Sequence, residues 1–208
     1  MKVKNRKIHV VGINSYEFEE LSSSVKSLLR NIENIAIPES YFDQIENWFS
    51  KSEVNNKNLF SSGSNNDLIN WLENNQSDVV LISRGDPLWF GIGRVLLDHF
   101  PKEELCFYPS NTCVQLAFRA LKKPWQSVKC ISIHGRETDE LIKAIKSRRY
   151  NIAIIPDPKK NNLELIRRNL LELQLDNFYE IWICEELGFK GEKLTALKIN
   201  EELPKDIS

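Results

Sequence analysis

Short apolar segments rich in β-branched residues alternate with longer amphipathic segments along most of this chain. The clearest short segment, Asp-Val-Val-Leu-Ile-Ser at 78–83, runs directly into Arg84-Gly85-Asp86-Pro87, a turn by composition. Apolar runs of about four to eight residues bounded by turn residues are typical of strands buried on both faces of a sheet. Because helical segments separate these runs, the pattern predicts an α/β fold with a mostly parallel sheet.

The same pattern, followed along the whole chain, predicts two α/β lobes of residues 1–123 and 124–208, with a junction at Pro124-Trp125. The Ser-, Asn- and Lys-rich stretch 50–66 is predicted to be a surface loop. The expected strands are 8–13, 34–37, 78–83, 105–108, 128–133, 152–156, 180–184 and 193–199. The expected helices are 17–30, 41–49, 68–73, 92–99, 113–121, 138–146 and 163–173.

Composition narrows the class of protein. The chain has 208 residues and a formal net charge of -1, whereas nucleic-acid binders usually carry a basic excess that neutralises phosphates. The apolar run near the N-terminus ends at Gly12, too early for a signal peptide or a membrane span, so a cytoplasmic protein is expected. The cysteines form no C-x-x-C pair and are expected to be reduced and buried, and no metal site is predicted. They are Cys106, Cys113, Cys130 and Cys184.

Three turns follow expected strands and precede expected helices: 12–15, 83–87 and 109–112. In open parallel sheets, ligands bind beyond the carboxyl ends of the strands, where helix N-termini also present free N–H groups. Gly85 can adopt a positive φ, and Asp86 can accept hydrogen bonds from hydroxyl or amino groups. A capped turn that binds no ligand explains Asp86-Pro87 equally well. The residues alone leave both interpretations open.

Several familiar motifs are excluded. Gly91-Ile92-Gly93 is followed by Leu96 where a dinucleotide fingerprint has its third glycine, and no phosphate-binding P-loop, zinc-protease or hydrolase motif occurs. His134-Gly135-Arg136 follows an expected strand and could present an imidazole and a guanidinium, or could be a solvated turn. The aromatic side chains Trp89, Phe90 and Trp125 are expected in the core or an interface, and a flat ligand could stack on one of them.

Longer strings resemble one family, the precorrin-6Y methylases of the cobalamin pathway, which methylate carbons five and fifteen of the macrocycle. Five segments match its characteristic strings in order, and weaker similarity extends back to Val10. The matching segments are Ser-Arg-Gly-Asp-Pro-Leu-Trp-Phe-Gly-Ile-Gly-Arg at 83–94, Ser-Asn-Thr-Cys-Val-Gln-Leu-Ala-Phe at 110–118, Lys-Pro-Trp-Gln at 123–126, Ser-Ile-His-Gly-Arg at 132–136 and Ile-Trp-Ile-Cys-Glu-Glu-Leu-Gly at 181–188.

The resemblance implies the two-lobed tetrapyrrole (class III) methylase fold, with S-adenosyl-L-methionine in a cleft between the lobes. It implies homodimers, and an association or fusion with a decarboxylating methylase unit. The first loop, Gly12-Ile13-Asn14-Ser15-Tyr16, departs from the G-x-G-P-G that is typical of the family. The cofactor contacts implied by position are Gly12, Gly85, Asp86, Pro87, Ser110, Asn111, Thr112, Asp157, Leu187 and Gly188.

The expected reaction is methylation of a carbon of a precorrin substrate. His134 is the candidate base because histidine side chains titrate near neutral pH, and Arg84 and Arg136 are candidates for the peripheral carboxylates of the substrate. One alternative is a methylase of the same fold that acts on another substrate. Another is a non-catalytic subunit that supports a partner methylase, an interpretation that the altered first loop keeps open.

Overall fold

The computed structural model describes residues 6–14, 18–61, 63–134, 137–157 and 162–199, and it divides the chain into two compact units, Met1–Thr112 and Cys113–Ser208. The division falls before helix α5 (Cys113–Leu121), whereas the sequence pattern predicted it after that helix. Ion pairs tie this region to the second unit: Arg119 of α5 pairs with Glu192, and Lys123 pairs with Glu180 at 2.8 Å. The α5 helix therefore belongs with the second unit.

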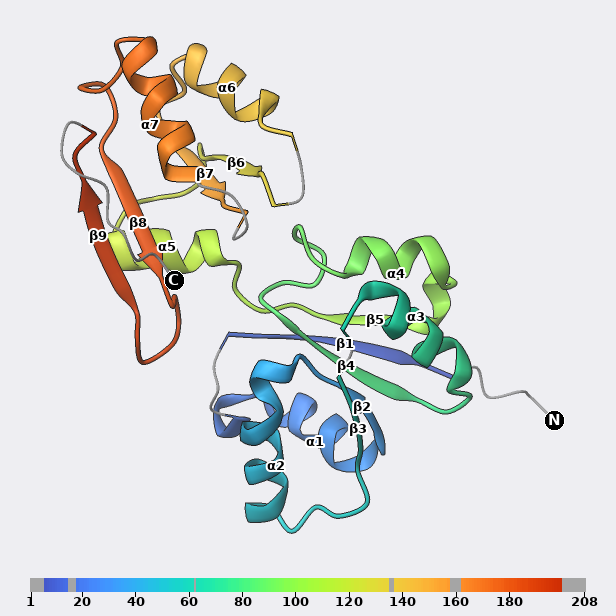
Figure 1. The fold of residues 1–208 in the computed structure, drawn as a ribbon. Helices are drawn as coiled ribbons and strands as arrows, with labels where there is room; N and C mark the ends of the chain where they lie inside the picture. Colours follow the sequence, from blue (N-terminus) through green and yellow to red (C-terminus); the bar gives the residue numbers. More distant parts are fainter. Residues whose placement is uncertain (1–5, 15–17, 62, 135–136, 158–161, 200–208) are drawn as a thin grey trace. The chain divides into compact units, whose positions relative to one another are not determined.

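The first unit contains a five-stranded sheet in the order β3-β2-β4-β1-β5. All four neighbouring pairs are parallel, as the alternation of strands and helices predicted. Figure 1 shows α1 and α2 on one face of the sheet and α3 and α4 on the other. The strands are β1 (Ile8–Ile13), β2 (Asn34–Ala36), β3 (Asn58–Phe60), β4 (Val79–Arg84) and β5 (Leu105–Tyr108), and the helices are α1 (Ser23–Asn31), α2 (Phe42–Lys51), α3 (Asn65–Asn74) and α4 (Gly93–His99).

The two central strands, β1 and β4, are buried along most of their length, which explains why their sequences are mostly apolar. Ile8 and Val10 of β1 pack with Leu72 of α3 and Leu96 of α4, all of them fully buried. Burial of an aliphatic side chain of this size contributes roughly 1.5–3 kcal/mol relative to exposure. Burial of apolar side chains therefore stabilises the sheet most at β1 and β4, the strands that lead into two of the three predicted loops.

Side chains satisfy the backbone groups left unpaired at helix ends. The hydroxyl oxygens of Ser22 and Ser64 accept from the first turns of α1 and α3. At the other end of α1, Lys57 Nζ donates to the carbonyl oxygens of Arg30 at 2.8 Å and Ile32 at 2.7 Å. Such caps are each worth about 1 kcal/mol.

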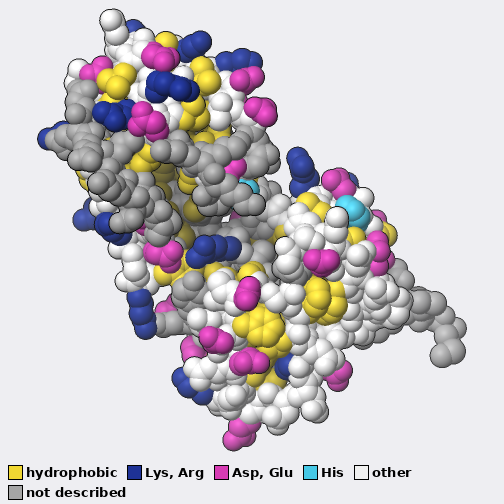
Figure 2. All heavy atoms as spheres, in the orientation of Figure 1, with side chains coloured by type: hydrophobic (Ala, Val, Ile, Leu, Met, Phe, Trp, Pro, Cys, Tyr) yellow, Lys and Arg dark blue, Asp and Glu magenta, His cyan; other side chains and the backbone are white. Residues whose placement is uncertain are grey.

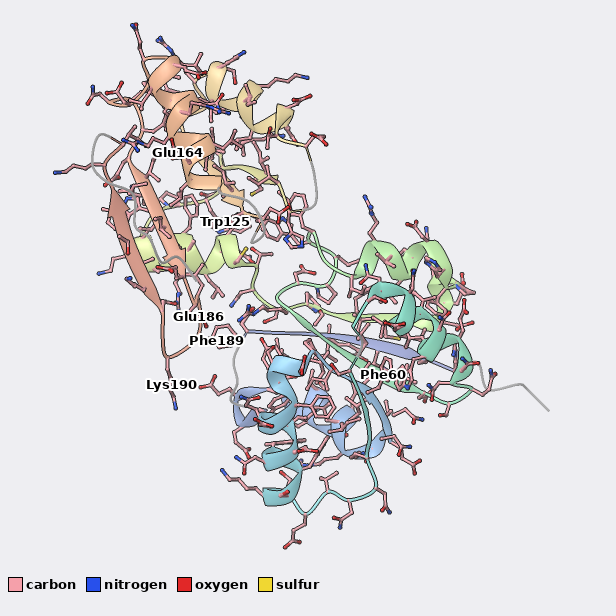
Figure 3. The ribbon with its side chains drawn as sticks, viewed as in Figure 1. Phe60, Trp125, Glu164, Glu186, Phe189 and Lys190 are labelled. Atoms are coloured by element: carbon pink, nitrogen blue, oxygen red, sulfur yellow. The ribbon has the colours of Figure 1, made fainter. Side chains whose placement is uncertain are left out.

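The second unit has its own core and two small sheets. Strands β6 (Lys129–Ser132) and β7 (Ile152–Ile155) are parallel, and β8 (Ile181–Glu185) and β9 (Lys193–Leu197) form an antiparallel hairpin. Phe189 and Lys190 lie at the turn of this hairpin (Figure 3). Helices α6 (Asp139–Lys146) and α7 (Asn162–Glu172) complete the unit. Its core contains Ile131, Ile133, Leu141, Ile145 and Leu170.

Three expectations about individual residues need correction. None of the four cysteines is fully buried; Cys113, at the start of α5, is exposed, and all four are free thiols. Of the core or interface placement expected for Phe90 and Trp125, the core is excluded, since 44% and 48% of their surfaces are exposed, and the interface stays a prediction. Residues 58–60, inside the predicted surface loop, form β3, where Phe60 stacks on Trp71 with a centroid distance of 4.9 Å (Figure 3).

Acidic and basic side chains are interspersed over the face of the molecule drawn in Figure 2, in keeping with the nearly balanced charge. Across the described residues, no helix combines the length and the apolar character that crossing a membrane requires.

Candidate functional site

A topological switch point lies between β1 and β4. The chain leaves β1 for β2 on one side, by way of α1, and leaves β4 for β5 on the other, by way of α4. The two helices therefore lie on opposite faces of the sheet (Figure 1), so the two connections separate above the carboxyl ends of β1 and β4. Crevices of this kind are the usual ligand sites of open parallel sheets.

The predicted loops after β1, β4 and β5 are in close contact at this edge. Gly85 N donates to Ile13 O at 2.8 Å, which joins the first two loops. A Cβ on Gly12 would clash with Gly85 O and lie 3.0 Å from both Pro87 Cδ and Ser110 N. Gly12 thus lets all three loops converge, a packing role that does not depend on a ligand.

Gly85 has a different role from Gly12. Its φ of +68° lies in the left-handed region, which residues with a Cβ adopt at a cost of roughly 1–2 kcal/mol. A Cβ there would meet nothing closer than Asn111 O at 3.6 Å and Asn14 Oδ1 at 3.9 Å. Both distances are ordinary van der Waals contacts, so the space beside Gly85 would hold a methyl group and is bordered by the loops after β1 and β5.

Asp86 both caps its turn and retains a free acceptor. Its Oδ1 accepts from Leu88 N at 2.9 Å, the hydrogen bond of a capped turn. No described residue donates to its Oδ2, which can therefore accept from a hydroxyl or amino group of a ligand. The two interpretations left open by the sequence are thus compatible, because each uses a different oxygen of one carboxylate.

The glycines at 91 and 93 support the same turn. Gly93 N donates to Pro87 O at 2.8 Å, and a Cβ on either glycine would lie 2.7 Å from that oxygen. Close packing against the Pro87 carbonyl explains both glycines. This agrees with the conclusion that the segment is not a dinucleotide fingerprint.

Asn14, which sequence reasoning did not select, connects the first loop to the third. Its Nδ2 donates to Ser110 Oγ at 2.7 Å and to Asn111 O at 2.8 Å. The only signal in the sequence was the departure of this loop from the typical G-x-G-P-G. The structure therefore brings Gly12, Gly85, Asp86, Pro87, Ser110 and Asn111 together, with Asn14 added and Thr112 next in the chain.

A histidine and a tyrosine join β1 to β5 below these loops. His9 Nδ1 lies 3.0 Å from the hydroxyl of Tyr108, the residue that ends β5. Burial lowers the pKa of His9 below its ordinary value of 6.5 and raises the pKa of Tyr108. The pair is therefore uncharged near neutral pH and serves as a neutral hydrogen bond between two strands that carry the site.

The other predicted residues are spread over strand ends and loops. Arg84 is the exposed last residue of β4, His134 is exposed in the turn after β6, and Asp157, after β7, is 6% exposed. Gly188 has a φ of +83° and donates its N–H to Glu192 Oε2 at 2.9 Å, so this N–H already has an acceptor. Arg136 lies outside the described residues, as does Ser15 of the first loop.

Comparison with known proteins gives one family. The profile of the Tetrapyrrole (Corrin/Porphyrin) Methylases matches residues 7–201. A probable cobalt-precorrin-7 C(5)-methyltransferase of Methanocaldococcus jannaschii is 24% identical over 204 residues, which cover 97% of this chain and 93% of that protein. A decarboxylating precorrin-6Y C(5,15)-methyltransferase of Sinorhizobium sp is 26% identical over 123 residues, 58% of this chain and 28% of the relative.

Solved structures show the same fold at low sequence identity. The precorrin-6Y methylase CbiE of Archaeoglobus fulgidus superposes with a TM-score of 0.65 at 22% identity, over 96% of this chain and 94% of that one. The cobalt precorrin-4 methyltransferase CbiF superposes with a TM-score of 0.72 at 15% identity, over 96% of this chain and 88% of that one. The uroporphyrin-III C-methyltransferase of Thermus thermophilus, solved with S-adenosylhomocysteine, superposes with a TM-score of 0.66 at 16% identity, over 93% of this chain and 88% of that one.

Proposed function

Because this chain belongs to the tetrapyrrole (corrin/porphyrin) methylases, we propose that it transfers a methyl group from S-adenosyl-L-methionine to a carbon of a precorrin macrocycle in cobalamin biosynthesis. The observation that carries the choice of substrate is the match to the Methanocaldococcus protein, which spans nearly the whole of both chains. The five matching strings support the same choice among the possible tetrapyrroles.

The carboxyl edge of the first sheet fits the proposed cofactor. Gly85 places no side chain between the first and third loops, Asp86 Oδ2 can accept from a ribose hydroxyl or an amino group, and Ser110 presents a half-buried hydroxyl. When bound, S-adenosyl-L-methionine supplies an electrophilic methyl group on a sulfonium sulfur. Asp157, Leu187 and Gly188 of the second unit are proposed as further cofactor contacts.

The residues of this chain contribute positioning, which can supply much of the acceleration of a transfer that needs an in-line approach. Asp86 and Ser110 would orient the cofactor, and Arg84 and Arg136 would hold the peripheral carboxylates of the macrocycle. His134 would take the proton released from the methylated carbon. Replacing either arginine should raise the KM for the macrocycle with little effect on cofactor affinity. Near-normal turnover of His134→Ala would remove His134 from the proposal.

The wider setting is part of the same proposal. Homodimers and a cytoplasmic location are expected of such an enzyme. An association with a decarboxylating methylase unit is supported by the Sinorhizobium relative, which carries that activity in its name and of which the match covers only 28%.

Calorimetric titration with S-adenosylhomocysteine tests the cofactor site directly. We expect saturable binding by the wild-type protein, weakened roughly tenfold by Asp86→Ala through loss of the Oδ2 acceptor. The transfer itself is tested by incubation with S-adenosyl-L-methionine and a mixture of precorrins, followed by mass spectrometry for the gain of one methyl group. Absence of binding by the wild-type protein would contradict the enzyme proposal and favour a non-catalytic subunit.

A further inference from the structure

The side chain of Asn14 makes the only described side-chain hydrogen bonds between the first and third loops of the site. Its Nδ2 lies 2.7 Å from Ser110 Oγ and 2.8 Å from Asn111 O. Asn14 and Ser110 are both half-buried at the carboxyl edge of the sheet. The side chain therefore bridges the two loops that border Gly85.

The chemistry of these neighbours determines which way the Asn14 amide faces. A backbone carbonyl such as that of Asn111 can only accept a hydrogen bond, so the NH₂ group of Asn14 must face it, and the amide oxygen cannot. One hydrogen of this NH₂ goes to Asn111 O, and the other goes to Ser110 Oγ. Ser110 is therefore an acceptor toward Asn14.

A serine hydroxyl carries one hydrogen, and the bond from Asn14 leaves that hydrogen unused. No described residue accepts it. Since Asn14 occupies an acceptor position of Ser110 Oγ, the hydroxyl hydrogen is left to point elsewhere at this edge. A ligand oxygen that meets Ser110 there can accept this hydrogen.

We infer that Asn14 is a positioning residue of the site, which holds Ser110 as a hydrogen-bond donor toward an oxygen acceptor of the bound cofactor. This inference rests on the proposed function and adds to it the polarity of one contact. A carboxylate oxygen and a ribose oxygen of the cofactor share the required chemistry. The inference also explains how this chain forms a cofactor loop with an asparagine at a position where the resembling loops have glycine.

A double-mutant cycle on S-adenosylhomocysteine binding tests this coupling. Asn14→Ala and Ser110→Ala should each raise the Kd roughly fivefold to tenfold. In the Ser110→Ala background, Asn14→Ala should raise the Kd little further, because Asn14 acts through the Ser110 hydroxyl. Ser110→Thr, which keeps the hydroxyl, should bind nearly as the wild-type protein does. If Asn14→Ala fails to fold, Asn14→Ser takes its place in the cycle.

Asn34 offers a matched control on the same sheet, since it begins β2 and so lies at the amino ends of the strands, away from the site. Its side chain also makes two hydrogen bonds, donating to Ser77 Oγ at 3.1 Å and accepting from Asn58 Nδ2 at 3.2 Å. Asn34→Ala should lower the melting temperature about as much as Asn14→Ala does and leave the Kd unchanged.

Two outcomes would overturn the inference, and only the second would also overturn the proposed cofactor site. Equal loss of affinity from Asn14→Ala in the wild-type and Ser110→Ala backgrounds would show that Asn14 acts independently of Ser110, with the proposed function intact. Failure of the wild-type protein to bind S-adenosylhomocysteine would overturn the proposed cofactor site, and the inference with it.

Discussion

The carbonyl oxygen of Gly85 fills the space in which a side chain on Gly12 would have to begin. Gly85 N also donates to Ile13 O, so the ends of β1 and β4 are joined both by a hydrogen bond and by this close approach. Because Ser110 N lies on the same side of Gly12, the third loop depends on the same contact. The geometry of the candidate site thus depends on the absence of one Cβ atom.

Replacing Gly12 with alanine should therefore be costly. The new Cβ would meet backbone atoms, which cannot move aside as a flexible side chain would, so we expect a loss of roughly 3 kcal/mol, at the upper end of the range for overpacking. Urea denaturation measures the loss, and Gly63→Ala is the control because a Cβ there would meet nothing closer than 3.8 Å. A Gly12→Ala protein as stable as the control would show that the three loops are not packed as described.

At Gly85 the expected cost comes from backbone conformation instead of space. Gly85→Ala should lower the free energy of unfolding by about 1–2 kcal/mol because its φ is positive. Gly85→Asn should cost less, since asparagine visits the left-handed region more readily than alanine does. Equal losses for the two variants in urea denaturation would contradict this explanation.

Asp86 allows its two roles to be measured separately. Asp86→Asn keeps an oxygen that can accept from Leu88 N, so its stability should stay within about 0.5 kcal/mol of wild type, whereas Asp86→Ala should lose about 1 kcal/mol. If the carboxylate also binds the cofactor, Asp86→Asn should still weaken binding of S-adenosylhomocysteine. Thermal denaturation and calorimetry of both variants separate the effects, and normal binding by Asp86→Asn would leave the carboxylate charge with no role in the site.

His9 should make stability depend on pH. Burial lowers its pKa in the folded protein, so the unfolded chain binds the proton more tightly. The contribution of neutral His9 is complete above pH 6.5 and is lost as the pH falls from 6.5 through the lowered pKa of the folded state. The free energy of unfolding should therefore rise with pH across this window, and His9→Phe should reduce the slope. Tyr108→Phe should keep most of the slope, because burial and not the hydrogen bond is the main cause of the shift.

The sequence predicted the strands with longer apolar runs and missed the short strand β3. The predicted bounds of β5 match the structure, and those of β4 differ by one residue, because uninterrupted apolar runs leave few alternatives. The Asn58–Phe60 strand is too short and polar at its start to be detected, and it forms because β2 offers a free edge to pair with. Likewise α3 begins at Asn65 and not at Leu68, since the Ser64 cap tolerates a polar first turn.

The site was predicted in part. The parallel sheet required the loops at 12–15, 83–87 and 109–112 to share an edge, and they do. The role of Asn14 could not be predicted, because its partners are almost a hundred positions away in the sequence and depend on strand order. The packing role of Gly12 was missed for the same reason, since a glycine in a loop looks alike whether it faces a ligand or a neighbouring carbonyl.

The position of β1 in the sheet has a consequence for how the protein is made. Ile8 pairs with Val79 on one side and with Leu105 on the other, so β1 precedes both of its partners in the chain, and its pairing is completed only after most of the first unit has been synthesised. Both edges of β1 are unpaired until β4 has been synthesised, and one edge remains unpaired until β5 follows, a condition that favours aggregation and slows folding. Because Gly12 and Asn14 sit at the end of that strand, the candidate site assembles in the same late step as the sheet.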